Sequence, residues 1–235
     1  MSTNLNQTNQ EAFDKNLEKT SEEGPNLNDT TSSEEFSRKF YLSMKKRRTC
    51  RWFSDEPINL NVINNCILAA STAPSGGNSQ PWFFSIITNQ KIKSQIRYFA
   101  EETEKNFYFQ KATDEFLEDL KPLGTHWQKS HLTEAPVLIV IFSKSFNLEQ
   151  DIKKRCYYPK ESTGIATGVL LTALHLVVLD TLTHTPNPMS FLNTILSRPI
   201  EEKPFLILAV GKKNVLYKPP VLSKKSLTEF SKIYS

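Results

Sequence analysis

Three arginines gather in one short stretch of the chain. The sequence RRTCR places Arg47, Arg48 and Arg51 within five residues. Side chains alternate between two sides of an extended segment, so Arg47, Thr49 and Arg51 are expected to face the same way. A guanidinium group binds phosphate through two parallel hydrogen bonds, so this stretch suits a phosphate-bearing ligand. On charge alone, a solvated basic surface is the alternative interpretation.

Two further stretches carry groups that suit a ligand. In TAPSGGNSQPW (72–82), Ser75, Gly76 and Gly77 offer backbone N–H groups and a hydroxyl to a ligand that approaches the main chain. An ordinary glycine turn is the alternative there. THTP (183–186) ends a buried run with two hydroxyls and an imidazole. By itself, such a sequence is more often a simple strand end.

Length and composition describe a chain that folds around one core. The chain has 235 residues, of which 38% are hydrophobic and 11% aromatic, which favours one domain. Residues 1–36 are acidic and polar and are predicted to be a disordered tail. Because the whole chain carries a net charge of +4, residues 37–235 are distinctly basic. A basic body suits a nucleic acid, a membrane surface or a phosphate-bearing cofactor.

Several familiar sites are missing from the sequence. It contains no G-x-G-x-x-G, no P-loop and no H-E-x-x-H motif, which argues against an ordinary NAD-binding fold and a zinc hydrolase. Cys50, Cys66 and Cys156 are too widely spaced for a disulfide framework or a metal site. With no signal-peptide pattern and no long apolar window, a soluble cytoplasmic protein is expected.

Hydrophobic periodicity predicts helices that alternate with strands. A helix is expected from about residue 60 to 71, capped by Asn59, with further helical patterns in 90–106 and 160–179. Buried strands are expected at WFFSIIT (82–88), VLIVIF (137–142), DTLTH (180–184) and FLILAV (205–210). The pattern predicts an α+β or layered α/β domain over residues 37–235. Residues 105–128 are expected to cover a site, and residues 211–235 to form an extended arm.

Together, these stretches resemble the flavin-binding elements of the nitroreductase family, and most closely its iodotyrosine deiodinase branch. The resemblance rests on RRTCRWFSDEP, TAPSGGNSQPW, EAPVLIVIF, GVLLTALHL, THTP and RPIEEKPFLILAVG, in the family's order and at near-family spacings. It covers about residues 40–230. It implies a nitroreductase-like α+β (α/β layered) fold that binds FMN in the interface of an arm-exchanged homodimer.

The resemblance also implies which residues hold the flavin. Thr185 is the expected catalytic hydroxyl, which accepts a hydrogen bond from the flavin N5–H. Lys224 stands where the family usually has a phosphate-facing arginine, and Gln80 replaces an acidic residue. The implied cofactor-binding residues are Arg47, Arg48, Thr49, Cys50 through its backbone, Arg51, Ser75, Gly76, Thr183, His184, Thr185 and Lys224.

A second group of residues matches the family's substrate contacts. Glu104 and Tyr108 are four residues apart and share a face if this segment is helical, and Lys129 follows. A carboxylate binds an ammonium group, whereas a hydroxyl and an ammonium bind a carboxylate, so the three residues suit an amino acid. A packed tyrosine between exposed charges is the alternative. Gly77 matches a backbone N–H that faces the substrate phenolate, and an ortho halogen lowers a phenol pKa from about 10.

The resemblance thus implies FMN-dependent reductive dehalogenation of halotyrosines. Mono- and diiodotyrosine would yield tyrosine and iodide, with electrons from NADPH through a partner reductase. Two alternatives stay open: a nitroreductase or flavin reductase that acts on aromatics or quinones, and a flavin-bound interaction protein. No nucleic acid, metal or membrane partner is expected.

Overall fold

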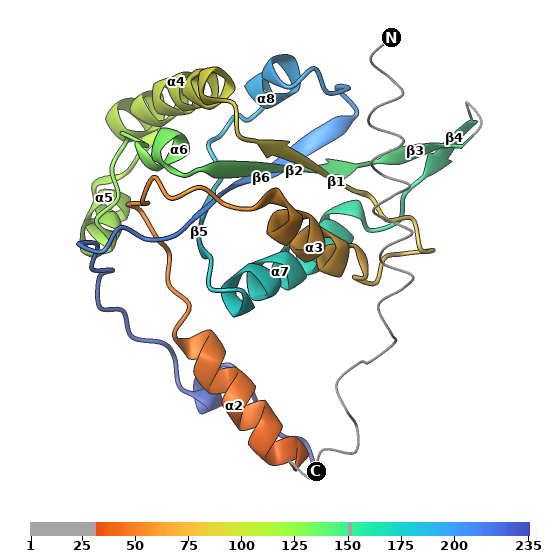
Figure 1. Cartoon of the computed structure of the whole chain (residues 1–235), viewed down its shortest axis with the longest axis vertical. Coiled ribbons are helices and arrows are strands. Elements are labelled where there is room, and N and C mark those ends of the chain that lie inside the picture. The colour runs from red at the N-terminus through yellow and green to blue at the C-terminus, as the bar shows by residue number, and fades with distance from the viewer. Residues whose placement is uncertain (1–31, 150–151) are drawn as a thin grey trace. The chain divides into compact units, whose positions relative to one another are not determined.

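A computed structural model describes residues 32–149 and 152–235 (Figure 1). The chain divides into two units, with the boundary in the sequence between Leu42 and Ser43. The first unit contributes most of helix α2 (Ser33–Lys45). Acidic residues in the first turn and Lys45 in the last complement the helix dipole. Of the tail expected over residues 1–36, residues 1–31 lie outside the described residues, and the last four belong to α2.

The second unit is built on a four-stranded antiparallel sheet with the order β1-β2-β6-β5. Its strands are β1 (Trp82–Ile87), β2 (Val137–Lys144), β5 (Asp180–His184) and β6 (Glu202–Gly211). Each coincides with a run that the sequence predicts to be a strand. Because every pairing is antiparallel, the fold is α+β, which confirms one of the two expected layer types.

Helices cover both faces of this sheet (Figure 1). On one face lie α3 (Leu60–Ser71) and α7 (Pro159–Leu176), and on the other α4 (Gln90–Asn106), α6 (His131–Glu134) and α8 (Phe191–Ile195). Successive residues of β2 point to opposite faces, so Ile139 joins the core under α3 and α7, whereas Val140 joins the core under α4 and α8. The Asn59 and Asn89 side chains cap α3 and α4, as the sequence predicts for Asn59.

The expected covering segment is largely helical. After α4, the chain makes a π-helix (Phe107–Lys111), α5 (Asp114–Leu120) and a 3₁₀ turn (Lys121–Leu123). Gly124, with a φ of 61°, ends this run in the left-handed conformation that glycine adopts without strain. The segment therefore leads from the end of α4 to the residues just before α6.

Two elements lie outside the main sheet. Strands β3 (Phe146–Glu149) and β4 (Ile152–Arg155) form a hairpin that the sequence did not predict. Beyond Gly211, the expected arm contains one short 3₁₀ helix (Leu227–Glu229) and many exposed apolar residues. Within the described part of the chain, no helix combines the length and apolar character needed to cross a membrane.

Candidate active site

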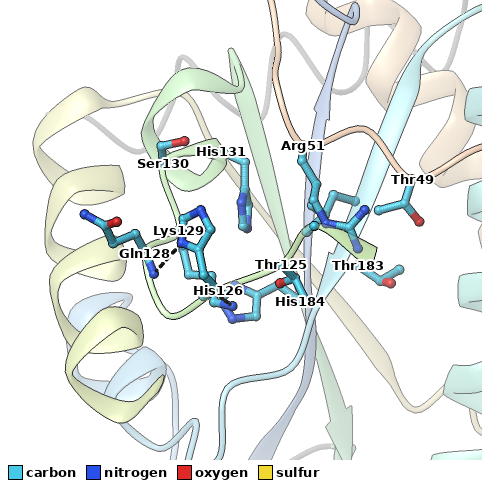
Figure 2. Close-up of a pocket in the computed structure, with 12 residues that line it drawn as sticks. Thr49, Arg51, Thr125, His126, Gln128, Lys129, Ser130, His131, Thr183 and His184 are labelled. Atoms are coloured by element: carbon cyan, nitrogen blue, oxygen red, sulfur yellow. Dashed lines mark hydrogen bonds between the residues drawn. The ribbon is translucent and has the colours of Figure 1, made fainter. Parts of the chain in front are cut away.

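A pocket of about 220 Å³ lies at the carboxyl end of β5 (Figure 2). Three parts of the chain build it: residues 49–51, residues 124–131 and the last three residues of β5. The lining residues are Thr49, Arg51, Gly124, Thr125, His126, Gln128, Lys129, Ser130, His131, Leu182, Thr183 and His184. Two of the three stretches quoted first from the sequence thus meet in one pocket.

Backbone pairing holds the arginine-rich segment against β5. Thr49 bridges Thr181 in parallel, and the Cys50 N–H donates to the Thr181 carbonyl over 3.0 Å. The Tyr217 hydroxyl, from the arm, donates to the Thr49 carbonyl over 3.1 Å. Arg51, which follows Cys50, lines the pocket. Its side chain makes no hydrogen bond or ion pair with another described residue. A guanidinium group is therefore available to an anionic ligand there.

Other members of the run have different surroundings. Arg48 donates a hydrogen bond to the Pro220 carbonyl of the arm, and neither Arg47 nor Arg48 lines the pocket. The Cys50 side chain is buried, and burial raises its pKa to about 12. Its thiol thus stays protonated and is no nucleophile, which fits the expected role through the backbone.

The predicted substrate residues form a buried cluster beside the pocket. Lys129 Nζ lies 3.2 Å from Glu104 Oε2, and His184 Nε2 lies 3.1 Å from Glu104 Oε1. The Lys129 ammonium also lies 5.4 Å from the centre of the Tyr108 ring. The structure therefore brings Glu104, Tyr108 and Lys129 together from α4, the π-helix and the segment before α6.

Burial and pairing set the protonation of this cluster. Burial by itself raises the pKa of Glu104, but hydrogen bonds and charge from His184 and Lys129 outweigh it and lower the pKa below its ordinary value. Burial lowers the pKa of Lys129, against the opposing effect of Glu104. Burial raises the pKa of Tyr108, so its hydroxyl stays protonated. The cluster can thus offer a carboxylate, an ammonium and a neutral hydroxyl.

Sequence reasoning missed the residues that support the cluster. Glu101 Oε1 accepts hydrogen bonds from the Lys129 backbone N–H over 2.8 Å and from Arg97 Nε over 2.7 Å. Arg97 Nη1 also donates to Thr133 Oγ1 over 2.9 Å. This chain of bonds ties the segment before α6 to α4. The signal in the sequence was the spacing of Arg97 and Glu101, four residues apart on a helix.

His131 is a second residue that the sequence analysis missed. Its buried ring packs edge-on against His184, with 5.4 Å between the ring centres. Burial is the main cause that lowers its pKa to about 2, followed by electrostatic interactions with His184, Lys129 and Arg51. Its Nε2 atom is buried and has no hydrogen-bond partner among the described residues. The only signal was its position, two residues after Lys129.

The end of β5 divides its side chains between two environments. Thr183 and Thr185 are exposed, and Thr183 lines the pocket, whereas the His184 side chain is buried beside Glu104 and His131. Thr185 does not line the pocket. The expected THTP site therefore exposes its hydroxyls on one side of the strand and turns its imidazole to the other.

The small-residue loop lies apart from this pocket. Ser75 Oγ accepts a hydrogen bond from the Gln80 backbone over 3.0 Å, and Gly76 bridges Tyr157. A Cβ atom on Gly76 would lie 2.8 Å from the Tyr157 carbonyl oxygen, so this position excludes any side chain. Gly77, with a φ of 59°, lines another hollow beside Tyr157. Lys224 is exposed in the arm. One chain thus brings together only part of the predicted flavin site.

The pocket residues fit an anionic flavin in chemistry but not in size. Arg51 offers a guanidinium that has no partner among residues 32–149 and 152–235, and Thr49 and Thr183 offer hydroxyl groups in the same pocket. The volume of about 220 Å³ is below the roughly 300–1,000 Å³ of pockets that enclose drug-sized ligands. The arginine and the hydroxyls suit the phosphate and polar edge of a flavin, but this pocket alone is too small to enclose the whole molecule.

Comparisons with known proteins give these features a family. Residues 44–212 match the nitroreductase family. An iodotyrosine deiodinase of Haliscomenobacter hydrossis is 48% identical over 176 residues, which cover 74% of this chain and 79% of that protein. One of Hydra vulgaris is 40% identical, covering 82% of this chain and 72% of that protein.

A solved structure agrees with these relatives. The crystal structure of oxidized iodotyrosine deiodinase bound to FMN and 3-iodo-L-tyrosine superimposes with a TM-score of 0.72 at 31% identity, and the match covers 83% of this chain and all of that one. The fold agrees with what the sequence resemblance implies, whereas the roles of the individual site residues stay predictions. The chain belongs to the nitroreductase family, within its iodotyrosine deiodinase branch.

Proposed function

We propose that this protein is an FMN-dependent reductive dehalogenase of halotyrosines, which converts mono- and diiodotyrosine to tyrosine and iodide. The observation that carries the proposal is the buried cluster of Glu104, Tyr108 and Lys129 beside the Arg51 pocket. A nitroarene or quinone needs no such pair of opposite charges. The carboxylate receives the substrate ammonium, and Lys129 with the Tyr108 hydroxyl receives the substrate carboxylate.

Each group of residues has a separate task in this proposal. Arg51, Arg47 and Arg48 neutralise the flavin phosphate or ring edge, with Lys224 as a further cation. Thr183 and Thr185 place hydroxyls beside the redox-active edge, with Thr185 as the catalytic hydroxyl. The Gly77 N–H donates to the substrate phenolate. When bound and reduced, FMN would supply the two electrons that, with a proton, replace the carbon–iodine bond by a carbon–hydrogen bond and release iodide.

A dimer completes the site in this proposal. The loop that carries Ser75, Gly76 and Gly77 adds no residue to the pocket of its own chain, and that pocket is small for a flavin. The arm exposes Val221 and Ile233 almost fully, as expected of a segment that packs on a partner. The loop of one subunit then meets the pocket of the other. Electrons from NADPH reach the flavin through a separate reductase, and a cytoplasmic location stays a prediction.

Titration of the FMN-loaded protein tests the proposed function. Addition of 3-iodotyrosine should quench flavin fluorescence and saturate, and chemical reduction with dithionite should then release iodide and form tyrosine in equal amounts. Tyrosine itself should bind far more weakly, because its phenol must first lose a proton. Rapid reduction of nitroarenes by NADPH, without binding of iodotyrosine, would instead support the nitroreductase alternative. Flavin binding with neither activity would support an interaction protein.

A further inference from the structure

Both carboxylate oxygens of Glu104 are already in use. Oε2 faces the Lys129 ammonium at 3.2 Å, and Oε1 faces His184 Nε2 at 3.1 Å. The exposed side-chain fractions are 15% for Glu104, 7% for Lys129 and 8% for His184. The three residues come from α4, the segment before α6 and β5. Glu104 is thus held from two sides by groups with different charge.

Entry of a zwitterion changes one of these two contacts. If Lys129 turns to the substrate carboxylate, as the proposed function requires, Glu104 loses its only cationic partner in the cluster. A buried carboxylate that loses a partner is costly. The substrate ammonium replaces that charge only if the carboxylate stays in position. The contact with His184 is the one that substrate entry leaves intact.

The hydrogen-bond pattern shows which protonation form of His184 can hold the Glu104 carboxylate. A carboxylate only accepts, so Nε2 of His184 must carry the hydrogen. The other ring nitrogen, Nδ1, is buried without a partner among the described residues. A hydrogen on Nδ1 would be a buried and unpaired donor, so the ring is neutral. A neutral donor fixes the carboxylate without cancelling the negative charge that the ammonium needs.

The charged and titratable surroundings favour the same form. His131 packs edge-on against His184 from α6, Lys129 pairs with the other carboxylate oxygen of Glu104, and Arg51 lines the same pocket. Burial lowers the pKa of His184, and Lys129 lowers it further, against the opposing effect of Glu104. An imidazolium would therefore be poorly tolerated beside these groups.

We propose that His184 is a positioning residue for substrate recognition: its neutral Nε2–H holds the Glu104 carboxylate where the ammonium of an amino-acid substrate binds. The proposal rests on the function proposed above and adds to it a residue that acts through Glu104. The resemblance assigns His184 to the flavin, whereas this proposal gives its side chain a contact with Glu104, where the amino-acid group of the substrate binds.

The test compares ligands with and without the amino-acid group on FMN-loaded variants. His184→Met, which removes the donor, should weaken 3-iodotyrosine binding about tenfold or more, as expected for a lost hydrogen bond to a charged group. Binding of 2-iodophenol should change less than about twofold, because that ligand does not use Glu104. His184→Gln places an amide N–H near the former Nε2 and should restore most of the affinity. Equal weakening of both ligands, or no rescue by Gln, would overturn the proposal.

A double-variant cycle and one spectroscopic measurement complete the design. In a Glu104→Gln background, His184→Met should add little further loss, since its effect passes through the carboxylate. The chain has only four histidines, so the ¹⁵N signals of His184 can be assigned in the unaltered protein by their absence from a variant. These signals should show the neutral Nε2–H form with and without iodotyrosine, and the Nδ1–H form would refute the proposal.

The ¹⁵N measurement is made on the unaltered protein. It therefore stays informative even if the His184 variants lose their flavin. If the unaltered protein shows the Nε2–H form but fails to bind iodotyrosine, the proposed function fails and the positioning role fails with it. If the unaltered protein binds iodotyrosine but its affinity is insensitive to the His184 donor, only the positioning role fails.

Discussion

The pocket at the end of β5 and the loop around Gly76 are built in opposite ways. The pocket assembles residues that are far apart in the sequence: backbone pairing with β5 places Arg51, and side-chain contacts with Glu104 tie Lys129 to His184. The loop is one continuous stretch, shaped by backbone contacts with Tyr157 and by the positive φ of Gly77. The charged groups beside the pocket thus depend on the packing of distant segments, whereas the loop is a single stretch whose shape depends on its own backbone.

Loss of the arginines in and before the pocket should have the strongest effect on flavin binding. Arg51→Ala combined with Arg47→Ala should remove nearly all bound FMN, because each lost charge-assisted hydrogen bond is worth about 1.5–3 kcal/mol. Absorbance at the flavin band per protein chain measures the loss. Arg38→Ala, an exposed arginine of α2, is the matched control and should keep its flavin. Full flavin content in the double variant would remove the arginine segment from the site.

A mixing experiment tests whether the pocket and the loop of one site come from different chains. Chains with Arg51→Ala and chains with Gly76→Val should each be inactive, the second because its side chain strikes the Tyr157 carbonyl. In mixed dimers with shared sites, one site carries both changes and the other carries none. In an equal mixture, half of the dimers are mixed and half of their sites are intact. About a quarter of the activity of the unaltered protein should therefore return. If no activity returns although mixed dimers form, each site lies within one chain.

Single substitutions of the charged residues that are proposed to bind the amino-acid group should have a smaller effect. Lys129→Ala or Glu104→Gln should weaken halotyrosine binding by roughly 2–4 kcal/mol, the range for removing one partner of a desolvated charge pair. A halophenol without the amino-acid group should bind almost unchanged. Fluorescence titration of both ligands measures the difference. Equal losses for both ligands would show that these residues do not bind the ammonium and carboxylate of the substrate.

The covering segment should become better protected when substrate binds. Phe109 and Phe116 are exposed, and a ligand beneath the segment would give residues 105–128 more to pack against. Saturating iodotyrosine should therefore slow proteolytic cleavage there several-fold, measured against cleavage near the carboxyl end. Unchanged cleavage within the segment at saturation would contradict a covering role.

The smallest effect concerns acid sensitivity and arises from His131. Its pKa is about 2 in the folded chain and 6.5 ordinarily, so below pH 6.5 the unfolded chain binds the extra proton. The stability that His131 contributes is thus complete above pH 6.5 and falls with pH, by up to about 1.4 kcal/mol per pH unit. Urea unfolding between pH 6.5 and 5 should show a shallower slope for His131→Phe. Equal slopes would mean that His131 does not titrate on unfolding.

The sequence predicted the elements whose hydrophobic pattern is strong. The run 137–142 reads as a strand because β-branched residues fill it, and α3 reads as a helix because its apolar residues recur at helical spacing after Asn59. The hairpin of β3 and β4 was missed because Lys153, Lys154 and Arg155 break any apolar alternation. The arm was expected to be extended, and its composition, rich in lysine and proline, supports that.

Within the site, spacing predicted the members better than their contacts. Glu104 and Tyr108 were paired from their four-residue spacing, since both fall in one continuous helical segment. No local pattern links Glu104 with His184, because their contact depends on how α4 crosses the end of β5. The flavin role given to the whole THTP stretch could not separate exposed threonines from a buried histidine, since that depends on which face of β5 meets the core.

The ion pair between Glu104 and Lys129 has a consequence for inhibitor design. A ligand with an ammonium but no carboxylate competes for Glu104 and leaves a buried lysine without compensation, and a ligand with only a carboxylate does the reverse to Glu104. A neutral ligand leaves the pair intact. Affinity should therefore not rise steadily as charged groups are added to a halophenol: a single charge should be worse than none, and only both together should improve binding.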